Sequence, residues 1–319
     1  VFAYGQTGGA WVREAGVPGG LVVHVGCGDG ERTGAMAEAG PFLVHGLSRD
    51  PERVASARAR LVTEGRYGDV SLAEWDGQDL PYTDGLVNLV IVSGGEAVPS
   101  AAEVARVLAP DGTALVASKA AGGFADGELV ARECGLAGWR KFRRPRPSNI
   151  DEWTHYLHSS DNNAVADDDV VGPPRHLQWV GSPRWARHHD NMASMSALVS
   201  AGNRIFYIFD EGPTSSILMP SDWKLIARDA FNGTILWKRD IPRWHTRLWP
   251  LKSGPAYLPR RLVAVGDTVY VTLGLDATLS ALDARSGGTQ WESAPVERRS
   301  QLDYFAAPTH LLHNEVLPF

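Results

Sequence analysis

The feature that most constrains this chain is an apolar stretch that runs directly into a turn rich in glycine. Residues 22–30 read Val-Val-His-Val-Gly-Cys-Gly-Asp-Gly, and a helix-forming stretch follows at Glu31–Ala39. Glycine reaches backbone angles that a Cβ atom forbids, and it lets a ligand approach the backbone closely. The first turn of the next helix offers free N–H groups. The pattern therefore predicts a strand, a nucleotide-binding turn and a helix.

The spacing of the glycines indicates which nucleotide fits this turn. A dinucleotide-binding turn needs a glycine at its sixth position, so that the helix packs closely and a pyrophosphate lies on the helix N-terminus. Glu31 occupies that position here. A diphosphate ligand is therefore disfavoured.

Strand and helix patterns alternate from residue 21 to residue 118. Five apolar segments are predicted as strands: Leu21–Val25, Phe42–Leu47, Val70–Glu74, Leu86–Val92 and Ala114–Ala117. The helix after the second strand is expected to have Asp50 as its N-cap and Pro51 as its first residue, with Val54, Ala57 and Leu61 on one face. Strands that alternate with helices predict a parallel, doubly wound sheet. A further helix is expected at Glu128–Cys134, and a strand near Trp139–Phe142.

The net charge, the cysteines and the apolar runs of the sequence restrict the classes of protein and of binding partner to consider. The net charge of −6 gives no general attraction for nucleic acid, and the short basic segment Lys141–Pro147 suits an exposed linker. Two cysteines, Cys27 and Cys134, cannot build a disulfide framework. No apolar run approaches the ~20 residues of a membrane-spanning helix. The chain starts at Val1 without methionine and ends just after a predicted turn, so it is expected to be a fragment.

After the linker, helical patterns fade and short β-rich runs repeat. Ala227, Asp229, Gly233 and Trp237 recur 54 residues later as Ala281, Asp283, Gly287 and Trp291. An upstream pair, Gly202–Tyr207 and Gly266–Tyr270, is offset by 64 residues, which predicts a ten-residue insertion between Asp210 and Lys224 in the first copy. A repeat of this length with about four short strands is typical of a propeller blade.

The N-terminal part resembles the class I S-adenosylmethionine-dependent methyltransferases from about Trp11 to Arg143. Three motifs carry the resemblance in the family's order: Val-Gly-Cys-Gly-Asp-Gly at 25–30, Asp-Gly-Gln-Asp-Leu-Pro-Tyr at 76–82, and Glu-Val-Ala-Arg-Val-Leu-Ala-Pro-Asp-Gly at 103–112. In that family the glycine turn holds the methionine part of the cofactor. The resemblance implies S-adenosyl-L-methionine as cofactor and these binding residues: Gly26, Cys27, Gly28, Asp29, Gly30, Ser48, Asp76 and Gly77.

One position departs from the family's pattern. The family usually has a carboxylate at the end of the second strand to hold the ribose hydroxyls, and Ser48 stands there. No catalytic residue is predicted, because methyl transfer from a sulfonium depends mainly on holding donor and acceptor in line. The leading expectation is a methyltransferase with an unknown acceptor. A non-catalytic protein-binding scaffold on a degenerate form of the same fold is the alternative.

The C-terminal part resembles the propeller of quinoproteins, the pyrroloquinoline quinone repeat family. Both copies of the repeat match Ala-x-Asp-x-x-x-Gly-x-x-x-Trp, in which tryptophan fills the gap between neighbouring blades. The resemblance implies a recognition or scaffolding module with a possible protein partner, and it favours the cell envelope or periplasm. Because only about two blades are present, no pyrroloquinoline quinone ligand is assigned. A part of a quinone-dependent dehydrogenase stays a second alternative.

Two polar clusters lie near the expected start of the propeller. Glu152, His155, His158 and Asp161 fall within ten residues, and two of them could place imidazoles on one helical face. They lack clear third and fourth ligands, so no metal is predicted and the segment is expected to be an ordered entry to the propeller. His188, His189 and Asp190 could line a funnel on the propeller face or serve in acid–base work.

Together the patterns predict an α/β Rossmann-like methyltransferase domain followed by an all-β partial propeller. The expected boundaries are 1–144 for the methyltransferase-like domain, 145–195 for the linker and entry segment, and 196–319 for the first blades.

Overall fold

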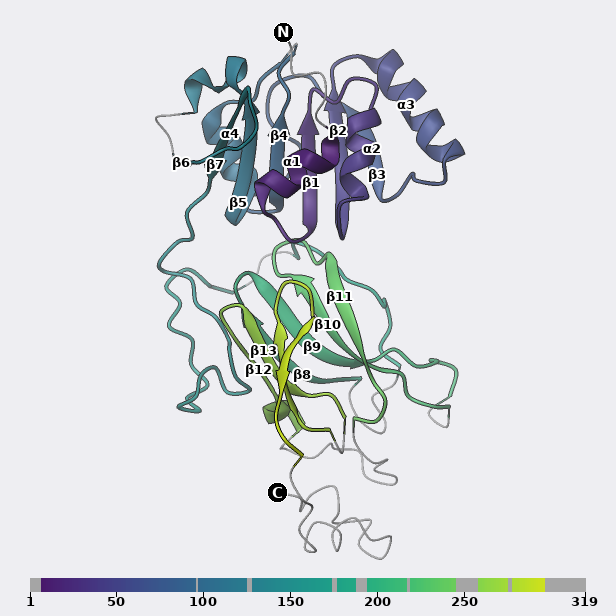
Figure 1. Cartoon of the computed structure of the whole chain (residues 1–319), viewed down its shortest axis with the longest axis vertical. Helices are drawn as coiled ribbons and strands as arrows, with labels where there is room; N and C mark the ends of the chain where they lie inside the picture. Colours follow the sequence, from purple (N-terminus) through teal and green to yellow (C-terminus); the bar gives the residue numbers. More distant parts are fainter. Residues whose placement is uncertain are drawn as a thin grey trace, which may run out of the picture. The chain divides into compact units, whose positions relative to one another are not determined.

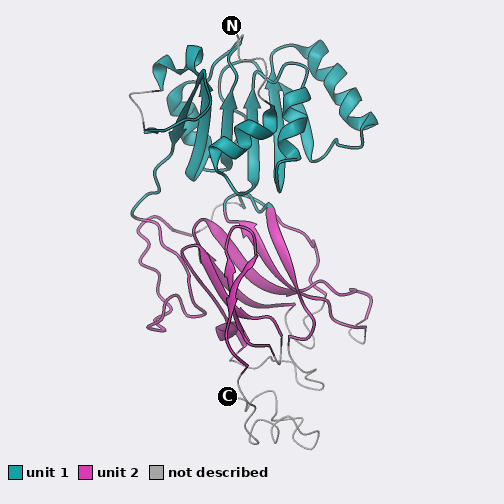
Figure 2. Ribbon diagram, in the orientation of Figure 1, with its two compact units in different colours: residues 1–148, 176–179, 231–234 teal, residues 149–175, 180–230, 235–319 magenta. Residues whose placement is uncertain are grey.

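The computed structural model describes residues 7–95, 97–124, 128–173, 177–187, 194–216, 219–244, 258–274 and 277–295. The chain forms two compact units (Figure 2). Unit 1 contains residues 1–148 with 176–179 and 231–234, and unit 2 contains residues 149–175, 180–230 and 235–319.

Unit 1 is built on a seven-stranded sheet with the order β3-β2-β1-β4-β5-β7-β6 (Figure 1). Five strands run parallel: β1 (Gly20–Val25), β2 (Phe42–Ser48), β3 (Val70–Glu74), β4 (Val87–Val92) and β5 (Leu108–Ala117). β7 (Trp139–Arg143) pairs antiparallel with β5, and β6 (Val130–Arg132) pairs antiparallel with β7. The parallel sheet predicted from the sequence is confirmed.

The helices of unit 1 begin where the sequence supplies caps. They are α1 (Gly8–Ala15), α2 (Glu31–Ala37), α3 (Pro51–Thr63), α4 (Ala101–Val107) and the short 3-10 helix η1 (Ser118–Gly123). The Asp50 side chain accepts hydrogen bonds from the backbone N–H groups of Glu52 and Arg53, each at 3.1 Å, which confirms the predicted N-cap of α3. Ser100 caps α4 in the same way by accepting from the Glu103 N–H at 3.1 Å.

Apolar side chains cover both faces of this sheet. Along β1, Val23 and Val25 join one hydrophobic core while Val22 joins the other. β4 divides in the same way, with Val90 and Val92 on one face and Leu89 and Ile91 on the opposite face. Because successive side chains of a strand point to opposite faces, the near-continuous apolar runs in the sequence correspond to a sheet that is buried on both sides.

One predicted helix is wrong. The segment Glu128–Cys134 was expected to be helical, but Val130–Arg132 forms strand β6 and pairs with Lys141–Arg143 of β7. A helix of seven residues gains little by itself, because the first turn fixes several residues for a single hydrogen bond. Pairing with β7 satisfies the same backbone groups, and tertiary context therefore decides the structure of this segment.

The described residues of unit 2 form two four-stranded antiparallel sheets. The first has the order β11-β10-β9-β8, formed by β8 (Met195–Ala201), β9 (Arg204–Asp210), β10 (Trp223–Asp229) and β11 (Ile235–Ile241). The second has the order β12-β13-β14-β15, formed by β12 (Leu262–Val265), β13 (Thr268–Thr272), β14 (Leu279–Asp283) and β15 (Thr289–Glu292), with the 3-10 helix η2 (Leu258–Arg261) before it. The two sheets share one hydrophobic core, and their edge strands β8 and β12 contact each other.

The two sequence repeats adopt the same local geometry. The β10–β11 register shifts between Ala227 and Arg228, and the β14–β15 register shifts between Ala281 and Leu282, one repeat later. Gly233 and Gly287 both have positive φ, 73° and 70°. Within the described residues the two sheets form no closed ring, so the propeller remains a prediction.

A tryptophan lies over the glycine of each repeat. The Trp237 indole packs on Gly287, with Cδ2 2.7 Å from where a Cβ would stand, and its Nε1 donates to the Ala284 carbonyl at 3.0 Å. Trp179 lies over Gly233 in the same manner. Any side chain at either glycine would meet the indole ring.

No helix among the described residues combines the length and the apolar character that crossing a membrane requires.

Candidate functional site

A cleft of about 210 Å³ opens in unit 1 at the carboxyl ends of β1, β2 and β4. β1 lies between β2 and β4 in the sheet, so the cleft is at the point where the strand order reverses. Ligands of open α/β sheets bind at such a point. The lining residues are Gly26, Gly28, Leu47, Ser48, Arg49, Asp50, Arg53, Trp75, Gly94, Gly95 and Ala97.

The glycine turn between β1 and α2 forms the floor of this cleft. Gly26, Gly28 and Gly30 have φ values of 78°, 58° and 74°, which L side chains rarely adopt. A Cβ on Gly26 would stand 2.5 Å from the Gly94 carbonyl oxygen, whereas a Cβ on Gly28 would meet nothing within 4 Å. Gly26 is therefore required by packing, and Gly28 leaves open space in the cleft.

The structure brings three of the eight predicted binding residues to the cleft wall, namely Gly26, Gly28 and Ser48. Gly30 is the N-cap residue of α2, and its N–H donates to the Cys27 carbonyl at 3.0 Å. Cys27 is 5% exposed and packs against Gly46, and burial raises the pKa of its thiol to about 12. The thiol is therefore neutral at physiological pH.

The other predicted residues lie in turns beside the cleft. The exposed Asp29 side chain accepts the Glu31 N–H at 3.1 Å, and the exposed Asp76 side chain accepts the Gln78 N–H at 2.9 Å. Gly77 lies against Ala97, a cleft residue.

The segment from the end of β2 into the first turn of α3 contributes one carboxylate and two guanidinium groups to the cleft lining, from Asp50, Arg49 and Arg53. The Asp50 carboxylate caps α3 and also pairs with the Arg53 Nε at 3.0 Å. The Ser48 hydroxyl accepts the Asp50 N–H at 3.2 Å. Both side chains near the expected ribose position thus make local contacts.

A buried histidine that sequence reasoning missed supports the cleft from behind. His24 is 1% exposed, and its two ring nitrogens lie 2.8 Å from the Thr33 Oγ1 of α2 and 2.6 Å from the Oγ of Ser93, next to Gly94. Burial, with a smaller contribution from Arg32, lowers the pKa of His24 to about 3, so the imidazole is neutral. The only sequence signal was a histidine inside an otherwise apolar strand.

Side-chain hydrogen bonds join the two other motifs of the methyltransferase resemblance. The Glu103 carboxylate accepts the Leu80 N–H at 2.6 Å and pairs with Arg106 at 2.6 Å. Arg106 also donates to the Tyr82 carbonyl at 2.8 Å. These hydrogen bonds hold the 76–82 loop against α4.

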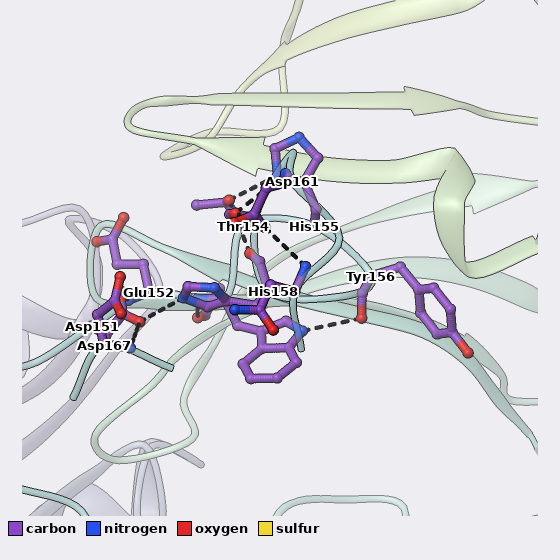
Figure 3. A network of polar contacts seen from close by, with 12 residues as sticks. Asp151, Glu152, Thr154, His155, Tyr156, His158, Asp161 and Asp167 are labelled. Atoms are coloured by element: carbon purple, nitrogen blue, oxygen red, sulfur yellow. Dashed lines mark hydrogen bonds and ion pairs between the residues drawn. The ribbon is translucent and has the colours of Figure 1, made fainter. Parts of the chain in front are cut away.

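The four residues considered for a metal each have a different partner (Figure 3). Glu152 accepts the Gly202 N–H at 2.7 Å, His155 contacts the Thr154 hydroxyl at 2.8 Å, and Asp161 accepts from the Ser159 hydroxyl at 2.6 Å. The two histidines do not share a helical face, because the His155 N–H donates to the His158 carbonyl across a tight bridge.

The same segment instead brings together Asp151, His158 and Asp167, whose ligand-type atoms lie within 4.8 Å of one another (Figure 3). The Asp151 Oδ2 accepts from the His158 Nε2 at 2.6 Å and from the Asp167 N–H at 2.8 Å. Two of these residues were missed from the sequence. Their mutual hydrogen bonds stabilise the entry segment. His188, His189 and Asp190 lie outside the described residues.

Comparison with known proteins agrees with this geometry. Residues 22–112 match the family model of a methyltransferase domain. The search of curated proteins finds no match. Within unit 1, residues 22–112 are therefore similar to a methyltransferase domain, and the sheet order is Rossmann-like.

Similar solved structures include a proposed S-adenosyl-L-methionine-dependent methyltransferase from Methanococcus maripaludis, with 13% identity, a TM-score of 0.38, and coverage of 45% of this chain and 85% of that one. Geranyl diphosphate methyltransferase in complex with GPP and sinefungin shows 18% identity, a TM-score of 0.34, and coverage of 38% and 58%. A methyltransferase in complex with the Haloferax volcanii Trm112 activator shows 19% identity, a TM-score of 0.36, and coverage of 42% and 87%.

Proposed function

We propose that unit 1 binds S-adenosylmethionine in the cleft at the ends of β1, β2 and β4 and transfers its methyl group to an acceptor still to be identified. The observation that carries this proposal is that the methyltransferase match at 22–112 contains the glycine turn whose Gly26 and Gly28 line the cleft. The cofactor supplies an electrophilic methyl group on a sulfonium, and the protein contributes position and shape.

The cleft residues suit a binding role without proton transfer. Gly28 leaves room for the methionine part of the cofactor above the turn. The exposed carboxylates of Asp29 and Asp76 are candidates to orient the ligand's ammonium group and its adenine. Cys27 and His24 are both neutral at physiological pH, because burial opposes their charged forms.

Titration calorimetry of the whole chain with S-adenosylhomocysteine tests the proposal. We expect saturable binding, and a dissociation constant above about 1 mM, or about −4 kcal/mol, would overturn the methyltransferase assignment. Gly28→Val should abolish binding, because the new side chain enters the cleft. Gly65→Val is the matched control, since Gly65 also has positive φ (66°) and open space but does not line the cleft.

For unit 2 we propose the first two blades of a propeller that serves as a recognition or scaffolding module. The packing of Trp237 on Gly287 supports this proposal. Gly287→Val should displace the Trp237 indole and lower the unfolding midpoint of unit 2, whereas Gly266→Val should not displace an indole. Gly266 also has positive φ (56°), and a Cβ there would meet nothing within 4 Å. Equal midpoints for the two variants would contradict the role given to the indole.

A non-catalytic scaffold is the second candidate for unit 1. It is favoured by Ser48 in place of an acid and by the engagement of Asp50 with α3 and Arg53. Absence of S-adenosylhomocysteine binding, with Gly65→Val and the parent chain both folded, would select this candidate. No observation on the described residues supports a quinone-dependent dehydrogenase.

A further inference from the structure

The rim of the cleft at the end of β2 is cationic. Among the lining residues, the ionised side chains are Arg49, Asp50 and Arg53, so two guanidinium groups face one carboxylate. S-adenosylmethionine carries a sulfonium, an ammonium group and a carboxylate on its methionine part, which the glycine turn is proposed to hold, and its ribose hydroxyls are neutral. Two guanidinium groups at the expected ribose position therefore have no anionic partner on the methyl donor.

Asp50 cannot serve a ligand here without giving up its present contacts. Its Oδ1 accepts from two backbone N–H groups of α3, and its Oδ2 lies 3.0 Å from the Arg53 Nε. If the Asp50 carboxylate turned toward a ligand, the N–H groups at the start of α3 would lose their acceptor and Arg53 would lose its ion pair. The pair Asp50–Arg53 is therefore internally neutralised, and Arg49 supplies the remaining charge.

Arg49 is free to bind a ligand. Within the described part of the chain it has no hydrogen bond and no ion pair, and its side chain is exposed. Its Cδ and Nε lie 3.4 and 3.6 Å from where a Cβ would stand on Gly77, so the side chain extends over the loop after β3. These are ordinary van der Waals distances, so the arginine lies against the backbone of Gly77.

We propose that Arg49 binds the phosphate of an adenine nucleotide that is phosphorylated on the 2′ or 3′ position of its sugar, in competition with S-adenosylmethionine. In nucleotide-binding α/β folds, the residue after the second strand lies near the ribose, where an acid binds the hydroxyl and an arginine accommodates a phosphate. Ser48 and Arg49 hold that place in this chain. The planar guanidinium group binds phosphate oxygens in a bidentate manner, which a hydroxyl ligand cannot exploit.

This inference uses the same cleft as the proposed function but does not depend on methyl transfer. It assigns to the cleft a second ligand class, one that the charge of the rim favours over the methyl donor. It also predicts that the preference weakens as salt is added, because Arg49 is exposed and its interaction is screened.

Titration calorimetry of the whole chain tests the proposal with four probes: adenosine, adenosine 2′-phosphate, adenosine 3′-phosphate and adenosine 5′-phosphate. We expect the 2′- or the 3′-phosphate to bind at least about tenfold more tightly than adenosine and than the 5′-phosphate, and to displace S-adenosylhomocysteine. Arg49→Ala should remove that preference. Arg49→Lys should retain part of it, because lysine keeps the positive charge but cannot bind two phosphate oxygens at once as a planar guanidinium does. Arg13→Ala is the matched control, because Arg13 is exposed on α1 and does not line the cleft.

Each outcome separates this inference from the proposed function. Affinities of adenosine and its 2′- and 3′-phosphates within threefold of one another, or a preference that survives Arg49→Ala, would overturn the inference even if S-adenosylhomocysteine binds. If inorganic phosphate, at the same concentration as the nucleotide, displaced the adenosine 2′- or 3′-phosphate, the inference would also be overturned. The rim would then bind any free anion. A phosphate preference that depends on Arg49, without S-adenosylhomocysteine binding, would overturn the methyltransferase proposal and the competition, and it would support the assignment of the phosphate to Arg49.

Discussion

The Nε2 atom of His24 lies 2.6 Å from the Oγ atom of Ser93, so a buried imidazole joins β1 to the residue that follows β4. The other ring nitrogen lies 2.8 Å from the Thr33 hydroxyl on α2. One neutral side chain thus links three elements around the glycine turn. Because Ser93 precedes Gly94 and Gly95 of the cleft lining, the position of this wall depends on His24.

Replacing this imidazole should therefore affect both stability and ligand binding. His24→Leu leaves the hydroxyls of Thr33 and Ser93 without their partner, and an unsatisfied buried polar group costs about 1–3 kcal/mol. We expect a loss of that size in the free energy of unfolding, measured in urea by far-UV circular dichroism. His24→Gln, which keeps a donor and an acceptor, should recover part of the loss. Equal stability of the leucine variant and the parent would contradict this role.

The depressed pKa of His24 predicts how stability responds to acid. In the folded chain this pKa is about 3, whereas an unfolded histidine titrates near 6.5. Below pH 6.5 the unfolded state binds a proton that the folded state excludes, so the stabilising contribution is present above pH 6.5 and is lost as the pH falls toward 3. The predicted slope is about 1.4 kcal/mol per pH unit for this single group. Urea unfolding between pH 7.5 and pH 5 measures it.

His24→Gln isolates this contribution, because glutamine does not titrate. The variant should lose less stability than the parent over the same pH range, while the carboxylates that also titrate in acid stay the same in both proteins. A parallel decline of the two proteins would show that His24 is not the proton-linked group.

The two cysteines should differ in reactivity. Cys27 is 5% exposed, and burial raises its pKa to about 12, so few thiolates form at pH 8. Cys134 is only partly buried. We expect iodoacetamide at pH 8 to modify Cys134 first and Cys27 only after unfolding, as measured by mass spectrometry of peptides. Rapid labelling of Cys27 in the native protein would contradict the burial of its side chain within the glycine turn.

The Glu103 side chain should contribute more to the free energy of unfolding than the Asp84 side chain, which contacts the same arginine. Glu103→Ala removes the acceptor of the Leu80 N–H and the partner of Arg106, and hydrogen bonds to a charged group contribute about 2 kcal/mol. Asp84→Ala removes a contact to the same arginine, but the Asp84 side chain is 78% exposed, so its loss should be below about 1 kcal/mol. Thermal unfolding of both variants measures the difference. A larger loss for Asp84→Ala would contradict the assignment.

Local patterns in the sequence predicted those parts of the fold that depend on neighbouring residues. The strands β1 to β4 follow from apolar runs, and the start of α3 follows from Asp50 and Pro51, whose capping geometry needs only a few residues. The segment Val130–Arg132 could not be predicted in this way, because its conformation depends on β7. The same holds for the entry segment, where Asp151 pairs with His158 across a tight turn.

The cleft was predictable only where the glycine turn forms it. Gly26, Gly28 and Ser48 were expected from the first strand and from alignment of the second. Gly94 and Gly95 form the opposite wall because β4, which they follow, lies beside β1 in the sheet. The local sequence does not reveal that strand order. His24 was missed because its role depends on Thr33 and Ser93, and the latter is 69 residues away along the chain.

The close approach of Gly26 to the Gly94 carbonyl oxygen means that main-chain atoms from two turns meet at the cleft floor, with the buried His24 behind them. Arg49, at the rim, takes no part in that contact. Substitutions at the rim can therefore change which small molecule binds without changing the cleft floor. In proteins that descend from such a chain, we expect sequence differences to concentrate at the rim.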